Sequence, residues 1–220
     1  MALDAPFIIP NVSEHCLNCE LVGSYIRLEP LDYGHTQGLA AASAKNPDLY
    51  RWSPIPQGEA AVTTYIDTAL EWRDAGTAIP YATVRQGDNE VIGSTRFWQI
   101  EYWPWPEGHP QHGKPTPDVC EIGWTWLAES AIRTPANTEA KLLMLTHAFE
   151  TMKVIRVSFH TDARNARSRA AIERIGGKYE GIIRAHRIAA DFTPRDSCRY
   201  SIMVEEWPEV QRNLLDRLHY

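Results

Sequence analysis

The stretch CEIGWTWL (residues 120–127) decides the fold, because its apolar and aromatic residues predict a short β-strand. The loop RTPANT (residues 133–138) follows, and the apolar segment from Glu139 to Met152 predicts a long helix. A second β-run, Val154 to Thr161, leads into Asn-Ala-Arg-Ser (residues 165–168), which opens another helix. Strand–loop–helix units place backbone N–H groups and the positive end of a helix beside a ligand phosphate. The two successive units therefore predict a site for a phosphate-bearing ligand.

The whole chain has the composition of a soluble globular protein, with 220 residues, 44% hydrophobic and 23% charged. This length is one large domain or two small ones, enough to bury a core. The net charge of −6 argues against a general affinity for nucleic acids or anionic membranes. No apolar run approaches about 18 residues, so no membrane-spanning helix is predicted. Residues 1–10 do not resemble a secretory signal, and we expect a cytoplasmic protein.

Outside this stretch, hydrophobic periodicity and turn residues predict three further strands before residue 120 and two after residue 176. Two helices precede the second strand, and one helix closes the chain. We expect an N-terminal extension (1–20), one domain (21–207) and a C-terminal helix (208–220). The expected strands are 25–28, 81–85, 91–100, 179–189 and 197–204, and the expected helices are 32–44, 59–75 and 208–218.

This order of elements, over about residues 21 to 207, resembles the GNAT N-acetyltransferases. Within them it is most similar to the Rim-type ribosomal-protein N-terminal acetyltransferases and their relatives. The resemblance implies a mixed α+β fold with a mostly antiparallel seven-stranded sheet flanked by helices. It also implies that acetyl-CoA lies in an opening between the fourth and fifth strands. The implied reaction is direct transfer of the acetyl group to a primary amine, either a protein N-terminus or a small molecule.

The phosphate loop of this family has the form Gln/Arg-x-x-Gly-x-Gly/Ala. Arg133 matches its first position, but Ala136 and Thr138 replace the two glycines. Pro135 has no N–H to donate, so we expect the N–H groups of Ala136, Asn137 and Thr138 to hold the phosphates. An ordinary helix N-cap at Asn137 is the alternative. Glu139 would repel a phosphate and is expected to point outward.

The second helix start supplies Asn165 and Ser168. Asn165 is expected to cap this helix by accepting the N–H of Ser168, and that local role alone explains both residues. The resemblance implies that Asn165 contacts the pantetheine arm of CoA and that Ser168 protonates the leaving thiolate. Arg167 and Arg169 either meet the nucleotide end of CoA or form a solvated basic face.

Acyl transfer to an amine also needs a polarised carbonyl and a base. A backbone N–H near Thr125, Trp126 or Leu127 can hold the carbonyl oxygen. Glu121 is the carboxylate within this strand, and partial desolvation would raise its pKa toward that of a working base. An edge or salt-bridged glutamate is the alternative. His160 and His186 are rival bases, of which His186 ranks next after Glu121.

Tryptophans cluster in sequence around the presumed acceptor mouth. Strand alternation predicts that Trp124 and Trp126 point to one face and Glu121 and Gly123 to the other. Most of these rings are expected in the core. Trp98, Trp124 and His186 are expected to line the acceptor site.

Two other features stay open. Cys16 and Cys19 form a C-x-x-C motif after His15, but no second ligand cluster completes a zinc site, so reduced thiols and no metal are expected. The proline-rich segment 101–118 is either a lid or a surface insertion.

Because the phosphate loop is altered, two other classes of function are retained as alternatives: a non-catalytic acyl-CoA sensor and a protein-interaction domain. For an enzyme, acetyl-CoA and an amine are the expected partners. The acceptor and a homodimer are left open.

Overall fold

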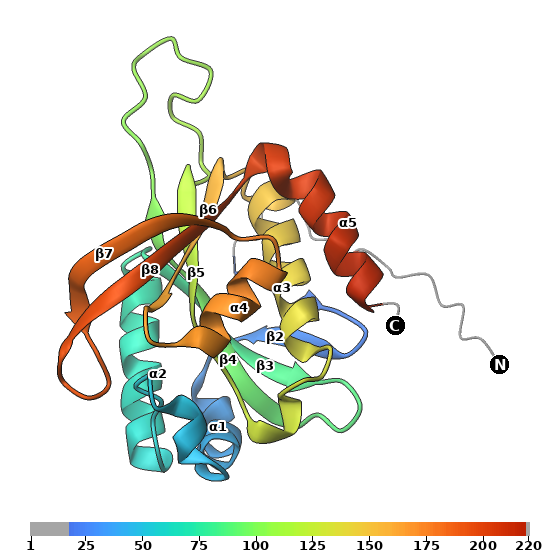
Figure 1. The fold of residues 1–220 in the computed structure, drawn as a ribbon. Coiled ribbons are helices and arrows are strands. Elements are labelled where there is room, and N and C mark those ends of the chain that lie inside the picture. The colour runs from blue at the N-terminus through green and yellow to red at the C-terminus, as the bar shows by residue number, and fades with distance from the viewer. Residues whose placement is uncertain (1–17, 219–220) are drawn as a thin grey trace.

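An eight-stranded sheet forms the centre of the structure, a computed structural model that describes residues 18–218 (Figure 1). Its order is β1-β2-β3-β4-β5-β6-β8-β7, and only the β5–β6 pair is parallel. The strands are β1 (Leu21–Val22), β2 (Ile26–Pro30), β3 (Ala78–Arg85), β4 (Val91–Glu101), β5 (Val119–Leu127), β6 (Arg156–Asp162), β7 (Lys178–Ile188) and β8 (Pro194–Met203). The helices are α1 (Thr36–Ala44), α2 (Glu59–Asp74), α3 (Ala136–Thr146), α4 (Ala166–Arg174) and α5 (Trp207–Leu218).

The predicted mixed fold and largely antiparallel sheet are confirmed, with one strand more than the seven expected. The extra strand is the two-residue β1, which pairs with β2 through Leu21 and Leu28. It has no hydrophobic alternation of its own, so periodicity alone does not predict it.

The helices cover both faces of the sheet. Successive residues of a strand point to opposite faces, and β4 shows which helix lies on each. The Ser94 hydroxyl accepts a hydrogen bond from Tyr65 of α2 at 3.0 Å, while the Thr95 hydroxyl donates to the sulfur of Met144 of α3 at 3.5 Å. The α2 face and the α3 face of the sheet are therefore distinct environments at this point.

The parallel pair β5–β6 is short, which opens the sheet. Pairing runs only from Val119 with Arg156 to Glu121 with Ser158. Residues 122–127 of β5 continue without a β6 partner. Because N–H groups alternate along a strand, about half of those in this segment point into the opening. The predicted opening between the fourth and fifth strands of the sequence is present here.

A β-bulge interrupts β5 inside this opening. Arg96 of β4 pairs with Gly123 and Ser94 pairs with Trp126, so Trp124 and Thr125 together oppose Thr95. Trp124 has φ +54°, a left-handed conformation that is uncommon for a bulky residue. The extra residue shifts the alternation of side chains, which changes the face on which the aromatic residues lie.

Helix α3 begins earlier than the sequence predicted. It starts at Ala136 rather than at Glu139, because Pro135 fits the helix entry, and it ends in a π-helical turn at His147–Thr151. The first turn carries Glu139, which is fully buried rather than pointing outward. Its carboxylate accepts the backbone N–H groups of Ser24, Tyr25 and Ile26, each at 2.8 Å, and so joins α3 to the β1–β2 turn.

The segment between β4 and β5 projects away from the body of the protein as an extended loop (Figure 1). Buried Asp118 anchors its base by accepting the Trp103 N–H at 2.6 Å and the Trp105 indole N–H at 2.7 Å. Lys114 pairs with the same carboxylate at 3.0 Å. These contacts order the loop, and its role as a lid or an insertion stays a prediction.

Candidate acyl-transfer site

The opening beside the β5 bulge contains three of the expected site residues, Thr125, Trp126 and Leu127. Thr125 is the second residue of the bulge, and Trp126 and Leu127 follow it, where the strand has no β6 partner. Trp126 is buried with its ring edge-on to Tyr50 at 5.9 Å, and the Tyr50 hydroxyl donates to the Leu127 carbonyl at 3.0 Å. These contacts fix the backbone whose N–H groups are candidates for holding a carbonyl oxygen.

Glu121 is buried at the start of this opening, with 2% of its surface exposed. Burial pushes the pKa of this carboxyl up, but the hydrogen bond from His160 and the charges of His160 and Arg187 outweigh it and lower the pKa below its usual value. The predicted rise in pKa is therefore wrong, because the strand partners of Glu121 were not visible in the sequence. A carboxylate with a low pKa is a weak proton acceptor.

His160 of β6 is the direct partner of Glu121. Its Nδ1 lies 2.8 Å from the carboxylate, and Arg187 approaches the same oxygen at 3.4 Å. A carboxylate can only accept, so Nδ1 carries the proton, and in the neutral ring the lone pair is left on Nε2. That Nε2 is buried and has no hydrogen-bond partner among residues 18–218. The pair thus presents an imidazole base fixed in one tautomer.

His186 of β7 lies beside this pair, with its ring 5.1 Å from that of His160. Burial, then the charges of Arg187 and His160, lower its pKa to about 4. His186 is therefore neutral at neutral pH and a poorer base than an ordinary histidine. The ranking of Glu121 and His186 above His160 does not fit this geometry.

The aromatic residues gather on the α2 face. The ring centres of Trp98 and Trp124 lie 6.1 Å apart. The ring centre of Trp72 of α2 lies 5.3 Å from that of Trp98 and 5.4 Å from that of Trp124. Trp98 is also the register partner of Glu121. The expectation that Trp124 and Glu121 point to opposite faces is wrong, because the bulge begins at Trp124 itself, whose left-handed backbone departs from the alternation of the strand.

The predicted phosphate loop has two parts. Arg133 is exposed and left-handed, with φ +62°, a conformation that glycine adopts without strain. Ala136, Asn137 and Thr138 lie in the first turn of α3, and Pro135 takes the N-cap position, so the alternative N-cap at Asn137 is wrong. The Ala136 N–H donates to the Thr134 hydroxyl at 3.3 Å. The N–H groups of the next residues begin the helix without intrahelical acceptors and remain candidates for an anion.

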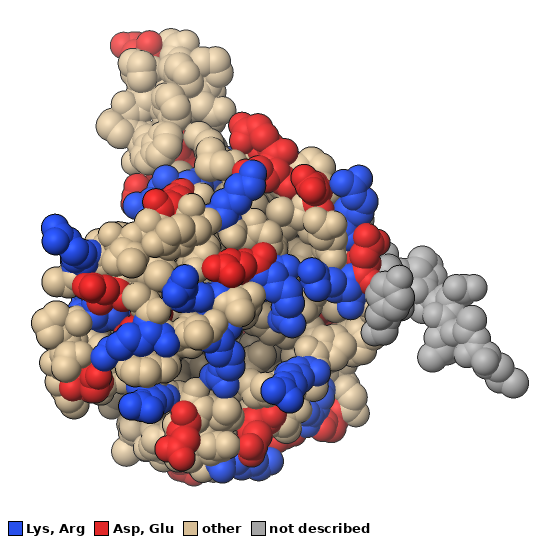
Figure 2. Space-filling model, in the orientation of Figure 1, with Lys and Arg blue, Asp and Glu red and all other residues tan. Residues whose placement is uncertain are grey.

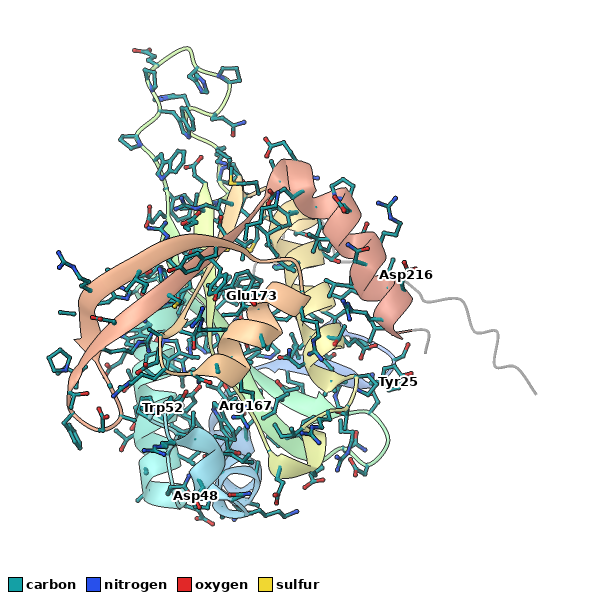
Figure 3. All side chains as sticks on the ribbon, viewed as in Figure 1. Tyr25, Asp48, Trp52, Arg167, Glu173 and Asp216 are labelled. Atoms are coloured by element: carbon teal, nitrogen blue, oxygen red, sulfur yellow. The ribbon has the colours of Figure 1, made fainter. Side chains whose placement is uncertain are left out.

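The start of α4 follows β6 closely. The predicted cap is confirmed, because the Asn165 side chain accepts the Ser168 N–H at 3.0 Å. Ser168 is half-buried, and its hydroxyl has no partner within the described part of the chain. Arg167 donates to the Leu49 carbonyl at 2.7 Å, which ties α4 to the loop beside Trp52 (Figure 3). Arg169 bonds the Tyr200 hydroxyl at 3.2 Å.

Basic side chains are common in the middle of the face that carries α4 and α3 (Figure 2). Among residues 18–218, no group of three or more His, Cys, Asp or Glu side chains is arranged to hold a metal ion. His15 and Cys16 lie outside the described residues. Within the same range, no helix has both the length and the apolar character needed to cross a bilayer.

Two buried cations escaped sequence reasoning. Arg96 lies among aromatic rings on the α2 face. Lys141 lies on the α3 face, where its ammonium donates to the Thr125 hydroxyl at 2.7 Å. Burial lowers the Lys141 pKa to about 7. The sequence signal was only a lysine within an otherwise apolar helix.

The GNAT acetyltransferase domain family matches residues 26–178. A T. thermophilus structure assigned as an acetyltransferase is 32% identical, with TM-score 0.72 over 90% of this chain and 96% of that one. A GCN5-related N-acetyltransferase from Brucella melitensis is 26% identical, with TM-score 0.77 over 92% and 86%. Mycobacterium smegmatis RimJ, solved with CoA-disulfide, shares the fold at 18% identity and TM-score 0.69 over 87% and 88%. No curated protein matched by sequence.

Proposed function

This chain belongs to the GNAT acetyltransferase family, and we propose that it transfers an acetyl group from acetyl-CoA to a primary amine. The observation that carries the proposal is the opening where β5 leaves β6 after Glu121, directly beside the bulge, where Lys141 of α3 contacts Thr125. A thioester arm in this opening would meet unpaired backbone N–H groups along its length. The phosphates would lie against the first turn of α3.

The buried pair supplies the proton chemistry. The His160 Nε2 accepts a proton from the acceptor ammonium, and Glu121 stabilises the resulting imidazolium through Nδ1. The free amine attacks the acetyl carbonyl, whose developing negative charge is held by a β5 N–H near Thr125. The C–N bond forms and the C–S bond breaks; the attacking nitrogen loses its second proton as the amide forms, and the Ser168 hydroxyl relays this proton to the departing thiolate.

Ligand binding gives a direct test of this proposal. Acetyl-CoA at about a hundred times its dissociation constant should stabilise the protein by roughly 2.7 kcal/mol. Thermal shift measures the stabilisation, and thiol release with a panel of amines measures turnover. Replacing Asn137 by Ile should weaken acetyl-CoA binding, because a β-branched side chain crowds the first turn of α3. The exposed Arg212→Met variant is the control. No thermal shift at millimolar acetyl-CoA would overturn the proposal.

A further inference from the structure

Arg96 is a buried cation that none of the described carboxylates neutralises. It is 1% exposed, and within the described part of the chain it forms no ion pair. Its guanidinium instead lies over the rings of Tyr65, Trp72 and Trp124, at 4.7, 5.4 and 4.9 Å from the ring centres. Its Nε and Nη2 are buried and have no hydrogen-bond partner among the same residues. Aromatic faces offset part of the cost of burying this charge, but they satisfy none of its N–H donors.

The same residue borders a cavity of about 490 Å³. Its other lining residues include Pro54, Ile55 and Tyr65 on the α1–α2 side and Trp124 from the bulge. The cavity is thus largely apolar, with one cation in its wall. Stacking uses the flat faces of a guanidinium, so the buried N–H donors in the plane of the group are left unpaired. Those donors form a fork that matches the two oxygens of a carboxylate.

We infer that this cavity binds a carboxylate of the acceptor, so that the acceptor class is an amine that also carries a carboxylate. The inference rests on the proposed function and narrows its substrate. The placement fits, because Arg96 pairs in register with Gly123, immediately before the bulge where transfer is proposed. A carboxylate on Arg96 would hold the rest of the acceptor against Trp124, at the edge of the opening. Arg187 stacks on neighbouring Trp98 at 4.5 Å and adds positive charge to the same face.

Two sources of such a carboxylate can be separated with matched acceptors. The first arm compares leucine with leucinamide, and the second compares a peptide amide that begins Ala-Asp with one that begins Ala-Asn. Rates are expressed per unprotonated amine, since the amide lowers the amine pKa. The wild type should prefer the acid of one pair by about tenfold to a hundredfold in kcat/KM, mainly through KM. The favoured pair identifies a free amino acid or an acidic peptide N-terminus.

Variants of Arg96 test whether this residue causes the preference for the acid over the amide. Arg96→Met should reduce the acid-to-amide ratio to about one, and Arg96→Lys should retain only part of it, because lysine keeps the charge without the fork. Acetyl-CoA binding should stay intact in both, and Arg212→Met is again the control. Where Arg96→Met does not fold, the wild-type ratios and the Arg96→Lys variant decide the question.

The outcomes separate this inference from the proposed function. Turnover of amines with equal rates for acid and amide in both arms would overturn the inference and leave the acetyltransferase proposal standing. If no amine is turned over, the proposal fails, and binding is then measured with N-acetyl-leucine and its amide by thermal shift. Equal stabilisation by both, or by neither, would overturn the carboxylate site. Stabilisation by the acid alone, lost in Arg96→Lys or Arg96→Met, would support it.

Discussion

Glu121 and Glu139 are both buried carboxylates, but the protein holds them in different ways. Glu139 accepts three backbone N–H groups at 2.8 Å. Backbone donors do not titrate, and the main chain holds them in place. Glu121 is held by two side chains, His160 and Arg187, in an opening of the sheet. The first arrangement fastens one element to another. The second leaves the buried Nε2 of His160 without a hydrogen-bond partner among residues 18–218, and we propose that this nitrogen accepts the proton of the acceptor. The partners of a buried carboxylate therefore indicate its role better than its burial does.

Removal of the Glu121 charge should have the largest effect. Glu121→Gln should lower kcat by about 10²–10⁴ with little change in acetyl-CoA binding, because the amide no longer stabilises protonated His160 and can stabilise the wrong tautomer. Since the pKa of Glu121 is held low, this carboxylate stays ionised from pH 6 to 9. An inflection of the wild-type rate in that range therefore belongs to another group. Steady-state kinetics across pH 6–9 measure both effects.

The His160→Gln variant tests whether the two residues act as one unit. Its loss of kcat should equal or exceed that of Glu121→Gln, and the double variant should lose little more than His160→Gln alone. Additive losses would mean that the residues act separately. Near-normal turnover of Glu121→Gln at every pH would show that Glu121 has no role in proton transfer, and that it does not differ from Glu139 in this respect.

The same substitution at Glu139 should affect folding instead. Glu139→Gln replaces an oxygen that accepts N–H groups by an NH₂ that faces them, and should cost about 3 kcal/mol of unfolding free energy. Urea unfolding at pH 7 measures this cost, with exposed Glu209→Gln as the matched control. The kcat of the folded variant should change far less than in Glu121→Gln. A loss below about 0.5 kcal/mol would show that the three N–H bonds do not anchor α3.

Much of the fold follows from local pattern. Hydrophobic periodicity predicted most helices and strands, and the Asn165 cap was visible because the Asn165 side chain and the Ser168 N–H that donates to it lie three residues apart. The bulge at Trp124 was not visible, because it depends on the register between β4 and β5. An error of one residue there moved Glu121 and Trp124 to opposite faces in the prediction.

The candidate site was harder to predict for a related reason. Its chemistry depends on contacts between segments distant in sequence, such as His160 with Glu121 and Arg96 with Tyr65. A sequence shows which residues can titrate but not what surrounds them. The pKa of Glu121 was therefore predicted in the wrong direction, and Arg96 was not singled out.

Lys141 is expected to have the smallest effect, a pH dependence of the unfolding free energy. It tests whether the α3 face, like the α2 face at Arg96, holds a buried charge. It lies two residues after Glu139, yet among the described residues only hydroxyl groups meet its ammonium, and burial lowers its pKa from 10.5 to about 7. Above pH 7 the folded protein has therefore lost a proton that the unfolded chain keeps. Unfolding free energy should rise with pH by up to about 1.4 kcal/mol per unit.

The usable window for measuring this slope is pH 7–9, because the raised pKa of buried Cys120 opposes the trend at higher pH. Lys141→Met should flatten the slope, whereas Lys45→Met, on the surface, should not. Equal slopes in urea unfolding of the wild type and Lys141→Met would show that Lys141 stays charged, and that the α3 face tolerates a buried cation as the α2 face does at Arg96.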